Sequence, residues 1–325
     1  MFPYIVGGFA ILLFFYQPVV QFFSPDSGRV IPHTPRPAIN ESLLAIDAAN
    51  ETAPLNCPED AYSVHILSKA PLVIYVENFI SKAERDNLLE LSSNDNSHLI
   101  PPFRSPQPSP YLPNTGLTLG PPRPPSEPLF TPSTLTSDGR TTYQDASVRD
   151  SAVALLPRTD AVRCVERRAL ALQGWRRDLW VERLRTQRYV AAGHYAHHFD
   201  WGSGARGWGR VSSMMVWVAA EDLEGGGTEF PLLRKNGDGD KWCQWVECPG
   251  GSEGRPSDES REDRVPEEED GLGVTFKPVA GNAVFWENFR PDGTGRGWEE
   301  TWHAGLPVKS GVKVGLNIWS WGRLD

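Results

Sequence analysis

The apolar positions along the chain predict a mixed N-terminal part and a strand-rich C-terminal part. Residues 70–79, APLVIYVENF, are rich in β-branched and aromatic side chains, which predicts a strand. Residues 81–92 open with Ser and carry Glu three positions later, ahead of leucines at helical spacing, which predicts a capped helix. Residues 160–173 hold apolar side chains along one helical face. From residue 180 onward, short strands rich in Val, Trp and Tyr alternate with Gly-rich turns, a pattern typical of an all-β sandwich or barrel.

Two stretches poor in apolar residues interrupt this pattern. Residues 95–135 contain a dense run of prolines that includes PPRPPSEP, which predicts a loop insertion; a polyproline II ligand or a hydroxylation target within the same chain is the alternative. Residues 250–270 are acidic and predict a surface loop. We expect one domain over residues 71–325 with both insertions, preceded by a polar, Pro-containing stalk at 24–70.

The first residues form the longest uncharged run of the chain. Residues 2–23 carry no charge, and a helix of this length would cross most of the hydrocarbon core of a bilayer. We expect residues 1–23 to form a transmembrane anchor, with a cleaved signal peptide as the alternative. Sequons at Asn40 and Asn50 lie in the stalk and favour a luminal body.

Composition narrows the possible partners. The chain has 325 residues, 39% hydrophobic content and a net charge of −9, which is enough for one substantial core. The acidic balance argues against a nucleic-acid partner, because phosphate binding needs clustered Lys and Arg. Cys57 and Cys164 are compatible with disulfides in an oxidising compartment. Cys243 and Cys248 are predicted to close a small disulfide loop; zinc is the alternative, but no second close Cys pair or nearby His completes a tetrahedral site.

The candidate chemistry begins at residues 188–201, RYVAAGHYAHHFDW. His198 and Asp200 are two positions apart, so on a strand both side chains point to the same face and can share a metal ion. His303 would complete a set of two imidazoles and one carboxylate, which suits non-haem Fe(II) because it leaves positions open for other ligands. A helical zinc pair of His194 and His198 is the alternative, but the flanking glycine and aromatic residues favour a strand.

The last predicted strand, residues 311–321, has one apolar face and one polar face. Lys313, Asn317 and Trp319 alternate with apolar residues and therefore point together to one side. A lysine that is buried needs an anionic partner, and the distal carboxylate of a bound diacid would serve.

These motifs together resemble the prolyl 4-hydroxylase alpha-subunit-like family of Fe(II)- and 2-oxoglutarate-dependent dioxygenases. The resemblance rests on H-x-D at His198 to Asp200, the distal His303, Lys313 ten residues later, the turn EDLEGGGTEFP at 221–231 and the strand and loop GNAVFWENFRPDGTG at 281–295. It spans roughly residues 71–325 without the two insertions. One departure is visible, because Gly227 stands where the family's turn usually has Glu.

The resemblance implies an α+β fold, in which a double-stranded β-helix, or jelly roll, forms the oxygenase core and N-terminal helices support it. It also implies roles for individual residues. The catalytic iron ligands would be His198, Asp200 and His303. The C5 carboxylate of 2-oxoglutarate would be bound by Lys313, Tyr189 and Thr228. The substrate side would include Tyr195, Arg210 and Trp319.

The implied reaction is hydroxylation of peptidyl proline coupled to oxidative decarboxylation of 2-oxoglutarate to succinate and CO2, with L-ascorbate as a further cofactor. The expected partner is a proline-containing protein or peptide. The expected location is the endoplasmic reticulum membrane, or the secretory pathway more broadly, with a single span and a luminal catalytic domain. The alternatives are the same chemistry on lysine or on a small molecule, or a non-catalytic peptide-binding module on the oxygenase fold.

Overall fold

The computed structural model describes most of the region beyond the first residues of the chain. The described residues are 37, 39–47, 54–93, 130–137, 141–202, 207–234, 239–248 and 272–324. The predicted anchor at 1–23 and most of both predicted insertions lie outside these ranges.

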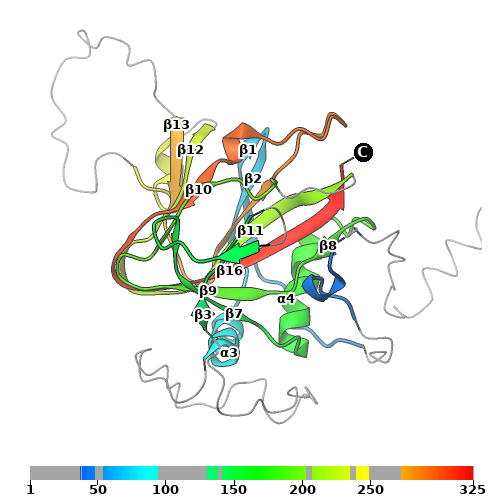
Figure 1. Ribbon diagram of the computed structural model, residues 1–325, viewed down its shortest axis with the longest axis horizontal. Helices are drawn as coiled ribbons and strands as arrows, with labels where there is room; N and C mark the ends of the chain where they lie inside the picture. Colours follow the sequence, from blue (N-terminus) through cyan, green and yellow to red (C-terminus); the bar gives the residue numbers. More distant parts are fainter. Residues whose placement is uncertain are drawn as a thin grey trace, which may run out of the picture.

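A large antiparallel sheet runs through the middle of the molecule (Figure 1). Its nine strands follow the order β1-β2-β14-β11-β16-β9-β7-β3, with β8 paired to β16. Their bounds are β1 Ser63–Lys69, β2 Leu72–Glu77, β14 Ala283–Glu287, β11 Trp208–Gly225, β16 Val308–Arg323, β9 Arg185–Tyr189, β7 Ala152–Leu155, β3 Thr131–Pro132 and β8 Trp180–Val181. The long strands β11 and β16 pair along most of their length and form the centre of this sheet.

A smaller antiparallel sheet packs against one face of the large one. Its five strands follow the order β13-β12-β15-β10-β6, and a hairpin of β4 and β5 forms a separate pair. Their bounds are β13 Leu272–Phe276, β12 Thr228–Arg234, β15 His303–Gly305, β10 His194–His198, β6 Arg149–Asp150, β4 Leu135–Ser137 and β5 Thr141–Tyr143. Tyr75 and Trp217 of the large sheet pack with Phe230 and Phe276 of the small one, and all four side chains are buried. Two facing antiparallel sheets confirm the predicted jelly-roll core.

Two helices cover the other face of the large sheet (Figure 1). They are α3, Lys82–Ser92, and α4, Asp160–Leu172, and both confirm the sequence prediction. Ser81 caps α3, and Glu84 completes a capping box, so the polar groups at the helix start are satisfied. The shorter helices are η2 Glu41–Leu43, α5 Gly239–Trp242 and η3 Glu299–Thr301.

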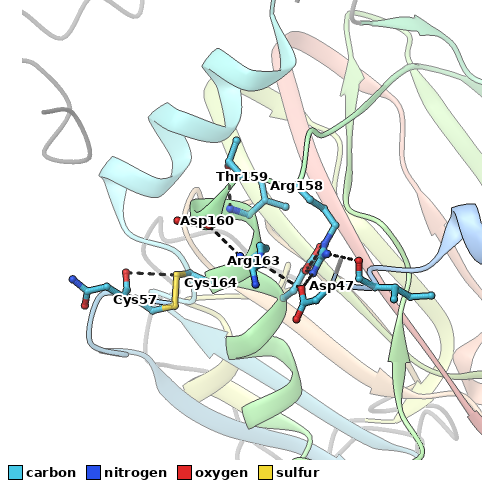
Figure 2. A network of polar contacts seen from close by, with 11 residues as sticks. Asp47, Cys57, Arg158, Thr159, Asp160, Arg163 and Cys164 are labelled. Atoms are coloured by element: carbon cyan, nitrogen blue, oxygen red, sulfur yellow. Dashed lines mark hydrogen bonds and ion pairs between the residues drawn. A yellow bond between two sulfur atoms is a disulfide. The ribbon is translucent and has the colours of Figure 1, made fainter. Parts of the chain in front are cut away.

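The segment before the first strand is linked to α4 by a disulfide (Figure 2). A disulfide joins Cys57 to Cys164, and Asp47 pairs with the guanidinium of Arg158 at 2.8 Å. The backbone N–H of Ala45 donates to the carbonyl oxygen of Val181 at 2.9 Å. The packed structure therefore begins before residue 71, since part of the region predicted as a stalk lies against the helical layer.

The structure also contains the predicted small disulfide loop and two strands beside the Pro-rich stretch. Cys243 and Cys248 are joined by a disulfide, as predicted. Within the predicted insertion at 95–135, residues 131–132 form β3 and pair with β7, and residue 135 begins β4. The insertion therefore ends in regular structure, where the sequence analysis predicted a loop.

The predicted single-pass membrane localisation is corrected. In the described part of the chain, no helix is long and apolar enough to cross a membrane. The longer of the two main helices, α4, has 13 residues, whereas a span of the hydrocarbon core needs about 20. The segment on which the prediction was based, residues 1–23, is outside the described residues.

A buried ion pair between the helices generates a stability prediction. Arg168 of α4 donates to Glu84 of α3 at 2.8 Å, and both side chains are nearly fully buried. Replacing Glu84 by Gln removes the buried charge partner of Arg168 and leaves only the half-exposed Asp60, so we expect Glu84→Gln to lower the free energy of unfolding by about 3 kcal/mol. Asp86→Asn on the same helix removes an exposed pair with Lys82 and should cost less than about 1 kcal/mol. Urea unfolding measures both values, and equal losses would contradict the role assigned to burial.

Candidate active site

Three potential metal ligands converge at one end of the small sheet. His198 ends β10 and lies directly opposite His303, the first residue of β15, in the antiparallel pairing. Asp200 follows β10 by two positions and turns its carboxylate toward both rings. One ligand atom from each of these side chains lies within 4.8 Å of the others. Cross-strand pairing therefore brings together residues that are far apart in the sequence.

The hydrogen bonds of the two histidines leave the correct nitrogen free. Nδ1 of His198 lies 2.8 Å from the carbonyl oxygen of Ala196, and Nδ1 of His303 lies 2.8 Å from that of Thr301. A carbonyl oxygen can only accept, so each Nδ1 carries the proton and donates it. The lone pair of each neutral ring is then on Nε2, which faces Asp200 at 3.6 Å from His198 and 3.9 Å from His303.

Asp200 is held in its charged form. Burial by itself raises the pKa of Asp200, but the neighbouring imidazoles of His198 and His303 and the guanidinium charge of Arg210 outweigh burial and lower the pKa well below its usual range. The indole N–H of Trp319 donates to Oδ2 of Asp200 at 2.9 Å. This bond fixes the carboxylate and leaves Oδ1 directed at His198.

His303 sits in an aromatic enclosure. Its ring stacks on Phe230 at 5.3 Å between centroids and meets Trp286 edge to face at 4.9 Å. Burial is the largest cause that lowers the pKa of His303, to about 4. The imidazole is therefore neutral at neutral pH, which is the form that binds a metal.

Lys313 supplies a buried cation from the opposite sheet. It lies opposite Tyr189 in the pairing of β16 with β9, and its side chain is 1% exposed. Nζ donates to the carbonyl oxygen of Gly226 at 2.6 Å and lies 4.6 Å from the centre of the Tyr189 ring. No carboxylate pairs with Lys313 in the described ranges. A buried ammonium with only neutral partners is costly unless an anion joins it.

These residues line one pocket between the two sheets. The predicted residues that line it are His198, Asp200, His303, Lys313, Tyr189, Thr228, Tyr195 and Trp319. Thr228 Oγ1 and Gln187 Nε2 are buried there without a hydrogen-bond partner among the described residues. Unsatisfied buried polar atoms are uncommon, so these two atoms indicate the place of a polar ligand.

The predicted substrate-side residues lie at the same pocket, although Arg210 is not among its lining residues. The Tyr195 ring stacks on His198 at 3.7 Å between centroids. Arg210 donates to both carboxylate oxygens of Glu182, at 2.6 and 3.2 Å, and its guanidinium lies 4.2 Å above the centre of the Trp319 ring. Arg210 therefore contacts the pocket through Trp319.

The sequence analysis gave no role to several residues at this pocket. Gln187 and Asn317 line it, and Arg149 and Arg185 lie over the rings of Tyr195 and Trp319. The signal for Gln187 was available, because it is two positions before Tyr189 on one strand and so shares its face. Arg149 gave no such signal, since β6 joins β10 only through tertiary pairing.

The glycine that departs from the family's turn has a local reason. A Cβ built on Gly227 would lie 2.6 Å from Cγ2 of Thr275 on the neighbouring strand. A side chain at this position would force β13 to move. The two preceding residues, Gly225 and Gly226, have positive φ angles of 75° and 68°, so the turn depends on glycine there as well.

Comparison with known families identifies the domain. Residues 184–321 match the family model of the 2OG-Fe(II) oxygenase superfamily. This part of the chain is similar to that superfamily of dioxygenases, and the matched region contains all three candidate metal ligands and Lys313. No curated protein matches the chain in sequence.

Solved structures with a similar arrangement include three prolyl hydroxylases. The viral collagen prolyl hydroxylase of Paramecium Bursaria Chlorella virus-1 is 19% identical, with a TM-score of 0.45, covering 77% of this chain and 96% of that one. A prolyl-4-hydroxylase from Pseudomonas putida is 16% identical, with a TM-score of 0.34, covering 55% and 74%. A Trichoplax adhaerens prolyl hydroxylase in complex with a hypoxia inducible factor peptide is 12% identical, with a TM-score of 0.36, covering 60% and 71%.

The superfamily implies Fe(II) and 2-oxoglutarate, and the residues present fit both groups. His198, Asp200 and His303 offer the mixed imidazole and carboxylate donors that suit non-haem Fe(II). Lys313 and the unsatisfied hydroxyl of Thr228 offer a cation and a donor for a carboxylate in the same pocket.

The burial of Lys313 predicts a pH dependence of 2-oxoglutarate binding. Burial lowers the pKa of Lys313 to about 8. The ammonium form binds a carboxylate and the neutral amine does not, so affinity should be constant below about pH 8 and fall by about tenfold per pH unit above it. Calorimetric titration of the Mn(II)-loaded protein measures this profile. Lys313→Met should bind weakly at every pH, whereas Lys309→Met, at an exposed lysine, should keep the wild-type profile.

The hydrogen bond to Asp200 predicts a loss of metal affinity. Trp319→Phe removes the indole donor, and we expect Co(II) to bind at least about tenfold more weakly because partners of a metal ligand orient it. Spectroscopic titration with Co(II) gives the dissociation constant. Trp245→Phe is the matched control, since it removes an indole donor to Glu77 instead. Unchanged affinity in Trp319→Phe would show that the bond does not orient Asp200.

Proposed function

We propose that this protein hydroxylates a peptidyl proline, using Fe(II) and 2-oxoglutarate. The observation that carries the proposal is the buried Lys313, which has no anionic partner in the described structure and shares one pocket with the His198, Asp200 and His303 set. A binding module would have no use for an uncompensated buried cation beside three metal ligands.

The residues of the small sheet would hold the metal. His198 and His303 present Nε2, and Asp200 presents Oδ1, because their other polar atoms are already engaged. When bound, iron with 2-oxoglutarate and dioxygen would supply the oxidising chemistry: 2-oxoglutarate loses CO2 and takes one oxygen atom of dioxygen to become succinate, and the other oxygen atom enters a C–H bond. We propose that residues 71–325 carry this activity, together with β1 and the earlier segment that pack against them.

Lys313 of the large sheet and Thr228 of the small sheet would orient the co-substrate. The Lys313 ammonium would bind the C5 carboxylate, and Thr228 would donate its unsatisfied hydroxyl to the same group. Tyr189 lies beside Lys313 and positions its stem. Met214, Met215 and Trp286 complete the wall with apolar surface, which excludes water from the reacting atoms.

The aromatic rings beside the metal ligands favour a proline substrate. Tyr195 stacks on His198, and Trp319 is bonded to Asp200, so both rings lie next to the reacting centre. Aromatic-lined grooves bind extended proline segments because the rigid pyrrolidine ring packs on flat aromatic faces. L-ascorbate is assigned the role of keeping the iron reduced between turnovers.

A lysine substrate fits this pocket less well than proline. Arg149 lies over Tyr195, and Arg185 and Arg210 lie over Trp319, so a substrate ammonium would approach several guanidinium groups. Like charges at such positions repel one another. A neutral pyrrolidine ring meets no such penalty.

The proposal predicts peptide-dependent turnover that requires the metal set. The purified protein, supplied with Fe(II), 2-oxoglutarate, ascorbate and a proline-containing peptide, should release succinate and give a peptide product heavier by one oxygen atom. His198→Ala should lower the rate by at least about a hundredfold, because it removes a metal ligand. His194→Ala is the matched control and should retain activity, since in the described structure the His194 ring is hydrogen-bonded to the backbone carbonyls of Ala192 and Ser147.

The same assay separates the competing functions. Oxygen incorporation into a lysine peptide and not into the proline peptide would assign the other oxygenase activity. Succinate release that no peptide stimulates, with no hydroxylated peptide product, would contradict peptidyl-proline hydroxylation. Equal rates for His198→Ala and wild type would exclude the proposed metal set.

A further inference from the structure

Arg185 points to the pocket face of β9 and is poorly neutralised. Residues 185, 187 and 189 alternate with the rest of β9, so Arg185 shares the face of Gln187 and Tyr189, which line the pocket. Its guanidinium lies 5.8 Å from the centre of the Trp319 ring, and its side chain is 28% exposed. Arg185 Nε is buried and has no hydrogen-bond partner in the described structure.

Among the described residues, the only carboxylate near Arg185 is already hydrogen-bonded to other side chains. Glu182 accepts two hydrogen bonds from Arg210 and one, at 2.7 Å, from the indole of Trp321. Its distance to the Arg185 guanidinium is 3.9 Å, which is beyond hydrogen-bonding range. Glu182 therefore lies near both Arg185 and Arg210, but of the two it is hydrogen-bonded to Arg210.

A further guanidinium reaches the pocket from the small sheet. Arg149 lies opposite Tyr195 in the pairing of β6 with β10, and its guanidinium is 4.6 Å above the centre of that ring. Arg149 Nε donates to the hydroxyl of Ser151 at 3.1 Å. Within the described residues, no salt bridge joins Arg149 to a carboxylate.

The positive charge at the pocket is a local excess in an acidic protein. The net charge of the chain is −9, yet Arg149, Arg185 and Arg210 lie over two pocket rings, and Glu182 pairs with Arg185 and Arg210 alone among them. The bound iron and 2-oxoglutarate would not neutralise these arginines. The positive charges of iron and Lys313 would balance the negative charges of 2-oxoglutarate and Asp200. Burial, with the nearby charges of Arg210, Arg149 and Arg183, lowers the pKa of Arg185 despite Glu182. An added anion would therefore reduce the electrostatic repulsion that the neighbouring arginines exert on Arg185.

We propose that the substrate of this protein carries acidic side chains, Asp or Glu, beside the hydroxylated residue, and that Arg185 and Arg149 bind them. The inference rests on the peptidyl substrate proposed above and specifies its class. A guanidinium offers paired donors to a carboxylate, and Arg185 Nε has no hydrogen-bond partner in the described structure. Tyr195 and Trp319, the rings beneath them, also flank the reacting centre, so the acidic and reacting residues must be close in the substrate sequence.

Direct binding of labelled peptides tests this inference without requiring turnover. One peptide carries a central proline flanked by Asp, and its matched partner carries Asn at the same positions. Fluorescence anisotropy with the Mn(II)- and 2-oxoglutarate-loaded protein should show the Asp peptide binding at least about tenfold more tightly, because hydrogen bonds to charged groups contribute about 1.5–3 kcal/mol. Arg185→Gln and Arg149→Gln should each remove most of this preference. Arg176→Gln, at an exposed arginine paired with Asp178, should leave it intact.

A charge-reversal variant distinguishes a loss of specific binding from misfolding. Arg185→Glu should bind a Lys-flanked peptide better than the wild type does, a gain that an unfolded protein cannot produce. Equal binding of the Asp and Asn peptides, or failure of both to bind, would overturn the inference. Turnover of a neutral proline peptide with no acidic preference would retain the hydroxylase assignment and reject the acidic substrate. Tight, Arg185-dependent binding of the Asp peptide without turnover would retain the acidic ligand and reject the hydroxylase assignment.

Discussion

The antiparallel pairing of β16 with β11 and β9 is the constraint on which the site depends. In this register, Lys313, Asn317 and Trp319 face the small sheet, whereas Val314 and Leu316 pack toward the helices. A shift of one residue would reverse every side chain and place the lysine in the helical core. Such a core could not accept an ammonium group. The apolar face of β16 thus fixes the position of its polar face.

The two sheets contribute different parts of the chemistry. The small sheet presents the histidines and Thr228, and the large sheet presents Lys313 and the indole that orients Asp200. Metal ligands and a co-substrate cation on separate sheets can be close only if the sheets pack tightly. The cluster around Trp217 and Phe230 supplies that packing, since both side chains are fully buried. Hydrophobic packing between the sheets therefore sets the geometry of the polar site.

The helical layer supports the sheet that carries Lys313 and Trp319. Apolar packing holds α3 and α4 on that sheet, and the buried pair of Arg168 with Glu84 joins the two helices. The disulfide between Cys57 and Cys164 adds a covalent link from the N-terminal segment to α4 (Figure 2). These contacts lie on the face opposite the pocket. They stabilise the frame without occupying the surface where a substrate would bind.

Local patterns in the sequence determined the helices, the strand character of the second half and the shared face of His198 and Asp200. The capping box at Ser81 and Glu84 and the two-residue spacing of His198 and Asp200 are short-range signals, because each depends on neighbours along the chain. The pairing of distant strands has no such signal. Only the tertiary structure placed His303 opposite His198 and brought Arg149 over Tyr195. Charge excess at the pocket arises from side chains that meet across two sheets, so it depends on the packing of those sheets and not on the order of residues.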